Sequence, residues 1–100
     1  MATGSIKKEG VSISFKTEEF AIPSTQIAGG SYAEISNINV AQTGWTAISL
    51  LRVYTNRSNA VLCGFNLSKP SELVRIMVKN VSQNAVVVDS GSITVLYAQT

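Results

Sequence analysis

The side chains that most often perform catalysis or hold metals are scarce in this chain of 100 residues. It contains no histidine, a single cysteine at position 63 and six acidic residues, among which Asp89 is the only aspartate. Histidine is the commonest general base and metal ligand, zinc sites need several nitrogen or sulfur ligands, and calcium loops need clustered acidic oxygens. The sequence therefore predicts no catalytic, metal-binding or cofactor-binding residues, and no enzyme activity.

Pairs of carboxylates are the remaining route to chemistry. Glu18 and Glu19 are adjacent, and neighbours in a strand point to opposite faces, so they cannot converge as an acid and a base. Glu34 and Glu72 are the two other candidates. They would support a hydrolase of cell-wall polysaccharide, a third and least favoured hypothesis, only if the fold brought them together in a cleft.

Charge and hydropathy exclude several classes of partner. Eight basic and six acidic residues give a net charge of +2, and apart from the adjacent Lys7 and Lys8 the basic residues are scattered singly. A surface that binds nucleic acid concentrates its cations. No window reaches the roughly 20 apolar residues of a membrane span, and no apolar run follows the N-terminal lysines. We therefore expect a soluble protein made in a cytoplasm, with no nucleic-acid partner and no membrane insertion.

The elements that would position any functional side chain are predicted to be strands. Ser, Asn, Thr, Val and Ile together account for 48 of the 100 residues; the β-branched types favour strands, while Ser and Asn favour turns. No segment sustains a helical apolar period with capping residues. The sequence predicts a small all-β domain, an antiparallel, jelly-roll-like β-sandwich over residues 11–100, preceded by a flexible lead-in over residues 1–10.

Alternating apolar residues and turn signals locate the strands. We expect strands over 11–15, 31–40, 45–55, 60–67, 72–81, 85–88 and 92–98. A charged turn or edge is expected over 16–19, and Pro23 makes 20–27 an edge segment or loop. The apolar phase slips between Ile35 and Ile38, which predicts a bulge. Turn clusters at 56–59 and 89–91 predict two hairpins, one joining 45–55 to 60–67 and the other joining 85–88 to 92–98.

The segment 45–53 is unusual because it is apolar on both sides. Strict alternation divides its side chains into one set of Trp45, Ala47, Leu51 and Val53, and another of Ile48, Leu50 and Arg52. A strand of a small sandwich normally has one apolar and one solvated face. We therefore predict that the second set, around Ile48 and Leu50, forms a subunit contact in a homo-oligomer.

Cys63 and the aromatic residues are expected to be largely structural. Cys63 lies among apolar neighbours and reads as a small buried residue, with an interchain disulfide or a reactive thiol as the alternative. Phe15, Phe65 and Tyr97 occupy apolar positions and are assigned to the core. Trp45 begins its strand directly after a glycine, so it either caps the core or lies at a subunit interface.

Three residues near turn clusters carry groups that can stack on or hydrogen-bond a sugar: Tyr32, Tyr54 and Arg57. The competing interpretation is that they are ordinary loop residues. If the second apolar face of segment 45–53 is instead a ligand groove, with Trp45 or Tyr54 exposed, the chain is a monomeric carbohydrate-binding or adhesin-like β-sandwich domain.

Short motifs over residues 44–100 resemble a known class of domain. They are Gly-Trp-Thr-Ala-Ile at 44–48, Val-Lys-Asn-Val-Ser at 78–82 and Val-Leu-Tyr at 95–97. In this order and spacing they resemble the small C-terminal β-domains of tail-fibre and baseplate proteins in phages and prophages of Gram-positive bacteria. The resemblance implies a trimeric β-sandwich head that closes a fibre or binds carbohydrate on a host surface.

This resemblance supplies the leading functional hypothesis. It implies a self-associating structural or binding module, with a homotrimer favoured, and with other tail proteins and a host glycan as partners. It also implies a location in the virion tail, or in the bacterial cytoplasm when the chain is expressed from a prophage. Such heads follow a long fibre shaft, whereas about ten residues precede the first strand here, so we expect either an excised fragment or a small stand-alone structural protein. Because receptor sites vary among these heads, no binding residue is implied.

Overall fold

A computed structural model describes residues 3–8 and 11–100, and over these residues the chain forms strands, turns and loops without a helix. The strands are β1 (Thr3–Lys8), β2 (Val11–Ile22), β3 (Thr25–Ile27), β4 (Tyr32–Asn39), β5 (Trp45–Tyr54), β6 (Ala60–Ser68), β7 (Leu73–Asn80), β8 (Val86–Val88) and β9 (Gly91–Gln99). All of their pairings are antiparallel. The predicted antiparallel all-β fold is confirmed.

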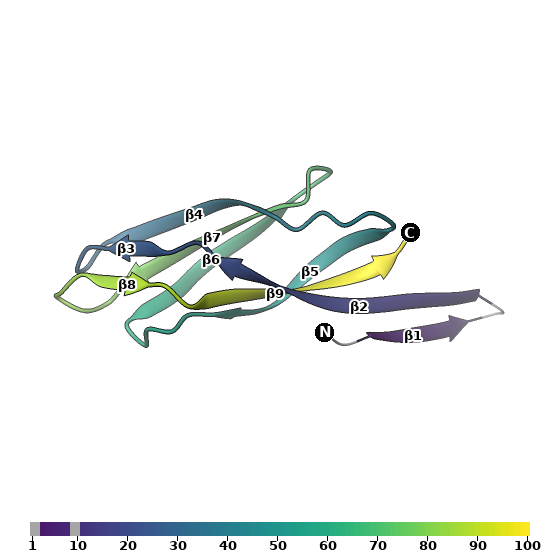
Figure 1. Cartoon of the computed structure of the whole chain (residues 1–100), viewed down its shortest axis with the longest axis horizontal. Coiled ribbons are helices and arrows are strands. Elements are labelled where there is room, and N and C mark those ends of the chain that lie inside the picture. Colours follow the sequence, from purple (N-terminus) through teal and green to yellow (C-terminus); the bar gives the residue numbers. More distant parts are fainter. Residues whose placement is uncertain (1–2, 9–10) are drawn as a thin grey trace.

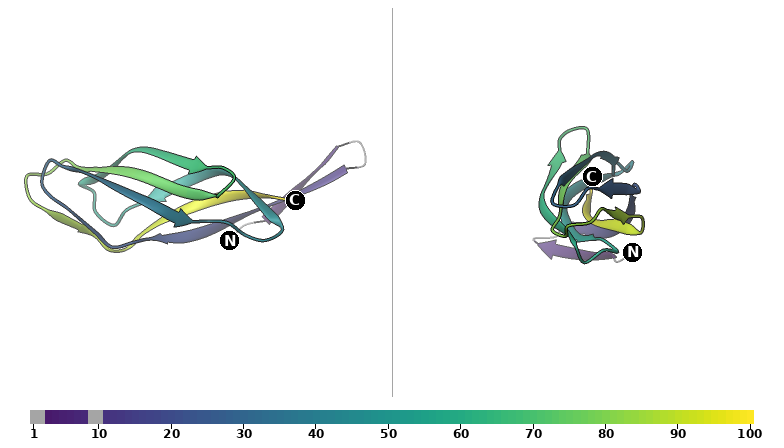
Figure 2. Two further views of the ribbon diagram at one scale, coloured as in Figure 1. Left: turned by 90° about the horizontal axis from the view of Figure 1, so that it is seen from above. Right: turned by 90° about the vertical axis from the view of Figure 1, so that its left-hand side faces the viewer.

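The strands form two main sheets and one small sheet. Sheet A has the order β1-β2-β9-β5, sheet C has the order β4-β7-β6, and β3 pairs with β8 in sheet B. Figure 2 shows sheets A and C as two stacked layers. The molecule is elongated, measuring 56 × 23 × 18 Å, and β1 and β2 run together beyond the other strands at one end (Figure 1).

The core lies between the inner faces of the two main sheets. From β7, Val74, Ile76 and Val78 are fully buried, as the alternation of that segment predicts. From β9, the fully buried side chains are Ile93, Val95 and Tyr97. They belong to one continuous apolar cluster, so the central strand of each sheet supplies the middle of the core.

Strand β5 departs from simple alternation, and this corrects the predicted subunit contact. Its register with β9 shifts twice between Ala47 and Arg52. Each bulge adds a residue, so inward positions recur every third residue instead of every second. Leu50 is therefore in the core, with 8% of its surface exposed, while Ile48 and Leu51 are 47% and 56% exposed. The assignment of Leu50 to the outer face was wrong, and Leu51 takes its place there.

The two predicted hairpins are also wrong. Strand β5 pairs with β9, and β6 pairs with β7, so residues 55–59 carry the chain from sheet A to sheet C. Likewise β8 pairs with β3, while β9 joins β2 and β5. Turn residues show that the chain reverses but not whether it stays in the same sheet, and here it changes sheet at both turns.

Local predictions along β2 and β4 had mixed outcomes. The expected slip in β4 is confirmed, because its register with β7 shifts between Ile35 and Ile38. Asn37 has a φ of 63° there, a left-handed conformation that asparagine tolerates. Residues 16–19, expected as a charged turn, lie inside β2 and pair with β9. Pro23 stands in the break between β2 and β3.

The expected lead-in contains a paired strand. Residues 3–8 form β1, which pairs with β2 from Thr3 opposite Lys16 to Lys8 opposite Val11. Residues 1–2 and 9–10 of the lead-in lie outside the described part of the chain.

Strand β6 forms one edge of sheet C and corrects two core assignments. Its register with β7 shifts between Leu62 and Gly64, and Cys63, which stands in this bulge, is exposed. Phe65 pairs with the fully buried Ile76 but is itself 54% exposed. Because none of the described strands continues the sheet beyond β6, side chains on its inner side are only partly covered.

Candidate functional site

The outer face of sheet A, which we call the A face, is half apolar: six of the twelve side chains named here are aliphatic or aromatic. Its members are Ile13, Phe15, Thr17 and Glu19 of β2, Thr94, Leu96 and Ala98 of β9, and Thr46, Ile48, Ser49, Leu51 and Arg52 of β5. Ile13, Ile48 and Leu51 are 45%, 47% and 56% exposed, so no described element covers them. Phe15, assigned to the core from the sequence, lies half-buried on this face opposite Ala98.

The outer face of sheet C, which we call the C face, carries mainly polar and charged groups. Its members are Tyr32, Glu34, Ser36 and Asn37 of β4, Leu73, Arg75, Met77 and Lys79 of β7, and Val61, Gly64, Asn66 and Ser68 of β6. Arg75 forms an ion pair with Glu34 at 3.1 Å. Lys79 lies over the Tyr32 ring, with its Nζ 5.1 Å from the ring centroid.

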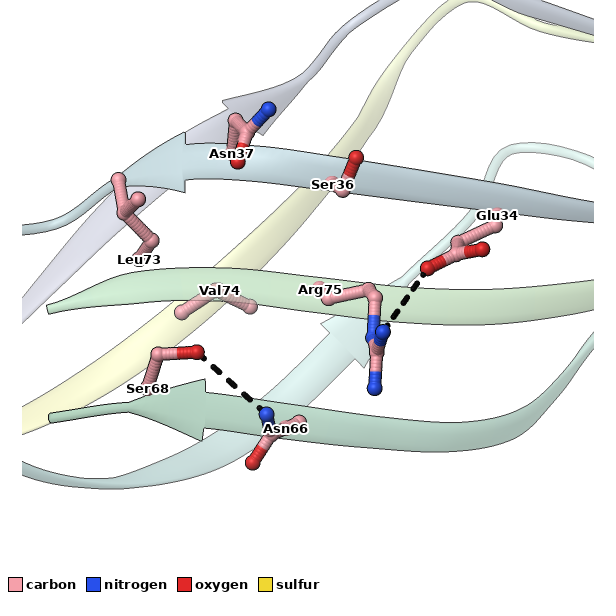
Figure 3. A pocket seen from close by; sticks show the side chains of 8 residues that line it. All are labelled: Glu34, Ser36, Asn37, Asn66, Ser68, Leu73, Val74 and Arg75. Atoms are coloured by element: carbon pink, nitrogen blue, oxygen red, sulfur yellow. Dashed lines mark hydrogen bonds and ion pairs between the residues drawn. The ribbon is translucent and has the colours of Figure 1, made fainter.

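A hollow of about 260 Å³ opens on the C face (Figure 3). It is lined by residues of all three strands of sheet C: Glu34, Ser36, Asn37, Asn66, Ser68, Leu73, Val74 and Arg75. Asn66 Nδ2 donates a hydrogen bond to Ser68 Oγ at 3.4 Å. The bulge after Ile35 brings both Ser36 and Asn37 to the rim, because a bulge places two residues opposite one on the partner strand.

A second hollow of about 160 Å³ adjoins the first and shares Asn66 and Arg75 with it. Gly64 and Met77 contribute to its lining. A side chain at position 64 would meet no atom within 4 Å, so the glycine leaves open space on the sheet surface. The two hollows together form a shallow trough that crosses sheet C.

A group of polar side chains also lies on the inner side of sheet A, at one end of the core. Lys16 Nζ is 4.7 Å from the centroid of the Trp45 ring and 3.7 Å from a carboxylate oxygen of Glu18. Lys16 also donates to Gln42, which in turn donates to Glu18 at 3.0 Å. Each charge has a partner, and Trp45 packs against the apolar core. Two roles were predicted for Trp45, and the structure shows that it caps the core.

Tyr97 contacts the same group from β9. Its hydroxyl donates to the carbonyl of Val40, and Lys16 Nζ lies 5.4 Å from its ring centroid. Burial raises the pKa of Tyr97 to about 12, and the negative charges of Glu72 and Glu18 add to the rise. The phenol therefore stays protonated and serves the core as a hydrogen-bond donor.

Glu72 clamps the two main sheets together. Its Oε2 accepts hydrogen bonds from the Ala47 backbone N–H at 2.6 Å and from Lys69 Nζ at 3.0 Å, and Lys69 also donates to the Ala47 carbonyl. Burial raises the pKa of Glu72, but the hydrogen bonds from Lys69 and Ala47 and the charge of Lys69 outweigh it, so the pKa lies below its ordinary value of 4.5. The ionised carboxylate of the β6–β7 turn thus holds the edge of β5.

The carboxylates do not converge in the way that the hydrolase hypothesis requires. Glu34 pairs with Arg75 on the C face, whereas Glu72 belongs to the clamp on β5 and does not line the hollow. Glu18 faces inward and Glu19 faces outward, which confirms that this adjacent pair points to opposite sides. Over the described residues, no group of three or more His, Cys, Asp or Glu side chains could hold a metal ion.

The three residues predicted as sugar contacts lie in different places. Tyr32 is on the C face and is 58% exposed. Tyr54 is 43% exposed at the end of β5, where Arg52 lies 5.3 Å from its ring centroid. Arg57 donates from Nε to the carbonyl of Val87 at 2.9 Å. They do not form one site.

The polar residues of the trough were not singled out from the sequence. Ser36, Asn37, Asn66 and Ser68 are common turn and strand-end types, and only the fold brings them to one surface. The one available signal was the phase slip between Ile35 and Ile38, which marks where two successive polar residues reach the same edge.

Comparison of the chain with protein-family models, with curated proteins and with solved structures finds no match. Among the described residues, no helix is long and apolar enough to cross a membrane.

Proposed function

We propose that this chain is a non-enzymatic structural and binding module that self-associates by burying its A face. The motifs over residues 44–100 resemble those of head-like domains of phage or prophage tails, and this resemblance favours three copies, with other tail proteins and a host-surface glycan as partners. The observation that carries the proposal is the set of uncovered apolar side chains on the A face, where Ile48 and Leu51 are 47% and 56% exposed.

The energetics of the A face favour burial between copies. Full burial of a large aliphatic side chain is worth about 1.5–3 kcal/mol, and the A face presents Ile13, Ile48 and Leu51 beside the half-buried Phe15 and Leu96. Soluble monomers rarely expose a contiguous apolar patch larger than about a few hundred Å². A second copy removes this surface from water.

The charges of the A face permit such an association. Among the A-face side chains that the structure describes, the charged ones are Glu19 and Arg52, which lie on opposite sides of β9 and both pair with Thr94. They stand at the margins of the apolar centre, where an interface tolerates polar and charged groups. Burial of the centre therefore does not force an unpaired charge into the interface.

A monomeric carbohydrate-binding or adhesin-like domain is the second candidate. The trough on the C face favours it, because that surface offers hydrogen-bonding side chains without any contribution from another copy.

Light scattering over a range of micromolar concentrations distinguishes the two candidates. Self-association predicts a mass that is a multiple of the 10.6 kDa chain, with three copies favoured. A mass of one chain at every concentration would overturn the proposal and leave the monomeric candidate.

A further inference from the structure

The trough on the C face has the chemistry of a ligand site. Four of its side chains, Ser36, Asn37, Asn66 and Ser68, are uncharged and carry both donors and acceptors. They come from β4 and β6, the two outer strands of sheet C, and so flank the trough on both sides. A ligand lying across β7 would be within reach of both groups.

The charged groups of the trough neutralise one another. Arg75 Nη1 lies 3.1 Å from Glu34 Oε1, and both side chains are about half exposed, at 55% and 48% (Figure 3). An anionic ligand would have to compete with Glu34 for Arg75, and a cationic ligand would have to compete with Arg75 for Glu34. The pair still offers free donors on the guanidinium and a free acceptor on the carboxylate. This arrangement favours an uncharged ligand that both gives and accepts hydrogen bonds.

Apolar surface lies beside these polar groups. Leu73 lines the larger hollow, and Met77 and Gly64 line the smaller one. Tyr32 is 58% exposed on the same face, two residues before Glu34 in β4. A ligand with hydroxyls on its edges and C–H groups on its faces matches this combination, because its edges would meet amides and hydroxyls while a face packs on apolar atoms.

We propose that the trough binds a neutral saccharide unit of a glycan. Its hydroxyls would exchange hydrogen bonds with Asn37, Asn66 and the Glu34–Arg75 pair, and one face of the ring would pack on Met77. The inference deepens the binding role in the proposed function and rests on that role, but it does not depend on self-association.

The test is a titration of the full chain with neutral sugars, followed by NMR of its amide resonances. The probes are glucose, galactose, mannose and N-acetylglucosamine, with glucose 6-phosphate and glucosamine as charged counterparts. The expected result is saturable shifts confined to residues 34–37, 64–68 and 73–77, caused by at least one neutral sugar and stronger than those caused by its charged counterpart. Shifts elsewhere, a preference for a charged sugar, or no saturable shift from any neutral sugar would overturn the inference.

Two variants and a matched control locate the binding. Asn66→Ala and Glu34→Gln should each weaken the binding of the selected sugar about tenfold, the effect of losing one or two hydrogen bonds. Glu19→Gln removes the charge of a similarly exposed strand glutamate on the A face and should leave binding unchanged. Equal affinity in all three variants would contradict the site.

The mass of each variant separates this inference from the proposed function. Loss of sugar binding with an intact oligomer in Asn66→Ala is the expected result. A wild-type oligomer that binds no sugar would overturn the site alone, whereas a wild-type monomer that binds sugar at the trough would overturn self-association alone.

Discussion

The two outer faces of this sandwich differ in chemistry although the two inner faces are alike. Inside, both sheets present fully buried side chains such as Ile76 of β7 and Ile93 of β9. Outside, the A face presents Ile48 and Leu51, while the C face presents a trough of amides, hydroxyls and one ion pair. The inner faces are constrained by packing, so the outer faces are where the two sheets can take different roles.

β-Bulges shape both outer surfaces. Two bulges in β5 put Ile48 and Leu51 outside the core, and one bulge in β4 brings Ser36 and Asn37 to the rim of the trough. A bulge adds a residue that the alternating pattern does not count, so it changes what the outer face displays while the inner face stays apolar.

Introducing a charge on the A face should have the largest effect, a change in the oligomeric state. Leu51→Glu places a carboxylate in the proposed interface, and we expect the oligomer to dissociate to a folded single chain, because burial of an unpaired charge costs several kcal/mol. The matched control is Val61→Glu, which changes an exposed apolar residue of the C face. Light scattering and circular dichroism give the mass and the fold. Equal masses for the two variants would remove the distinction between the faces.

The inner side of sheet C should be the next most sensitive region. Asn80 is fully buried; its Nδ2 donates to the carbonyls of Ile27 and Asn84, and its Oδ1 accepts from the Ser82 N–H. Asn80→Ala removes these three hydrogen bonds, including the donor to the buried Ile27 carbonyl, so we expect the free energy of unfolding to fall by about 3 kcal/mol.

The control for this prediction is a second asparagine of the same sheet. Asn66→Ala, on the outer face, should change the free energy of unfolding by no more than about 0.5 kcal/mol. Urea denaturation measures both variants. If the free energy of unfolding fell by a similar amount in both variants, the sheet would not have one sensitive inner side and one tolerant outer side.

The Glu72 clamp between the two sheets should show a smaller, pH-dependent effect. Because the pKa of Glu72 is lower in the folded chain than its ordinary value of 4.5, the clamp stabilises the fold above that pH, and its contribution is lost as the pH falls through the lowered pKa. Glu72→Gln should cost about 1 kcal/mol at pH 7 and remove this part of the acid sensitivity. Urea denaturation at a series of pH values checks it. A variant with the same acid dependence as the parent chain would show that the clamp does not join the sheets energetically.

The amino-acid composition and the alternation of apolar with polar residues predict the fold class because they indicate which side of each strand is buried. The strands over 45–54 and 73–80, the buried row Val74–Ile76–Val78 and the bulge after Ile35 all follow from the pattern of apolar residues. These features depend on which side of one strand is apolar, which neighbouring residues reveal.

The pairing of strands and the exposure of side chains depend on residues far apart in the sequence, so the local sequence pattern did not predict them. The turns at 55–59 and 89–90 change sheets, which only the partners of β5 and β9 decide. Lys16 and Glu18 read as a charged turn, yet they face inward because Gln42 and Trp45 partner them. The trough was missed for the same reason, since its polar residues come from separate strands and share no local pattern.

Thiol accessibility tests most directly whether the A face is buried between copies while the C face stays free. In a Cys63→Ser background, Leu51→Cys and Val61→Cys each place one thiol on an outer face, and the rate of alkylation is measured for both, folded and in denaturant. We expect equal rates in denaturant and, in the folded protein at assembling concentrations, a rate at least about tenfold lower for Leu51→Cys than for Val61→Cys, with the difference vanishing on dilution. Equal folded rates at every concentration would contradict the account.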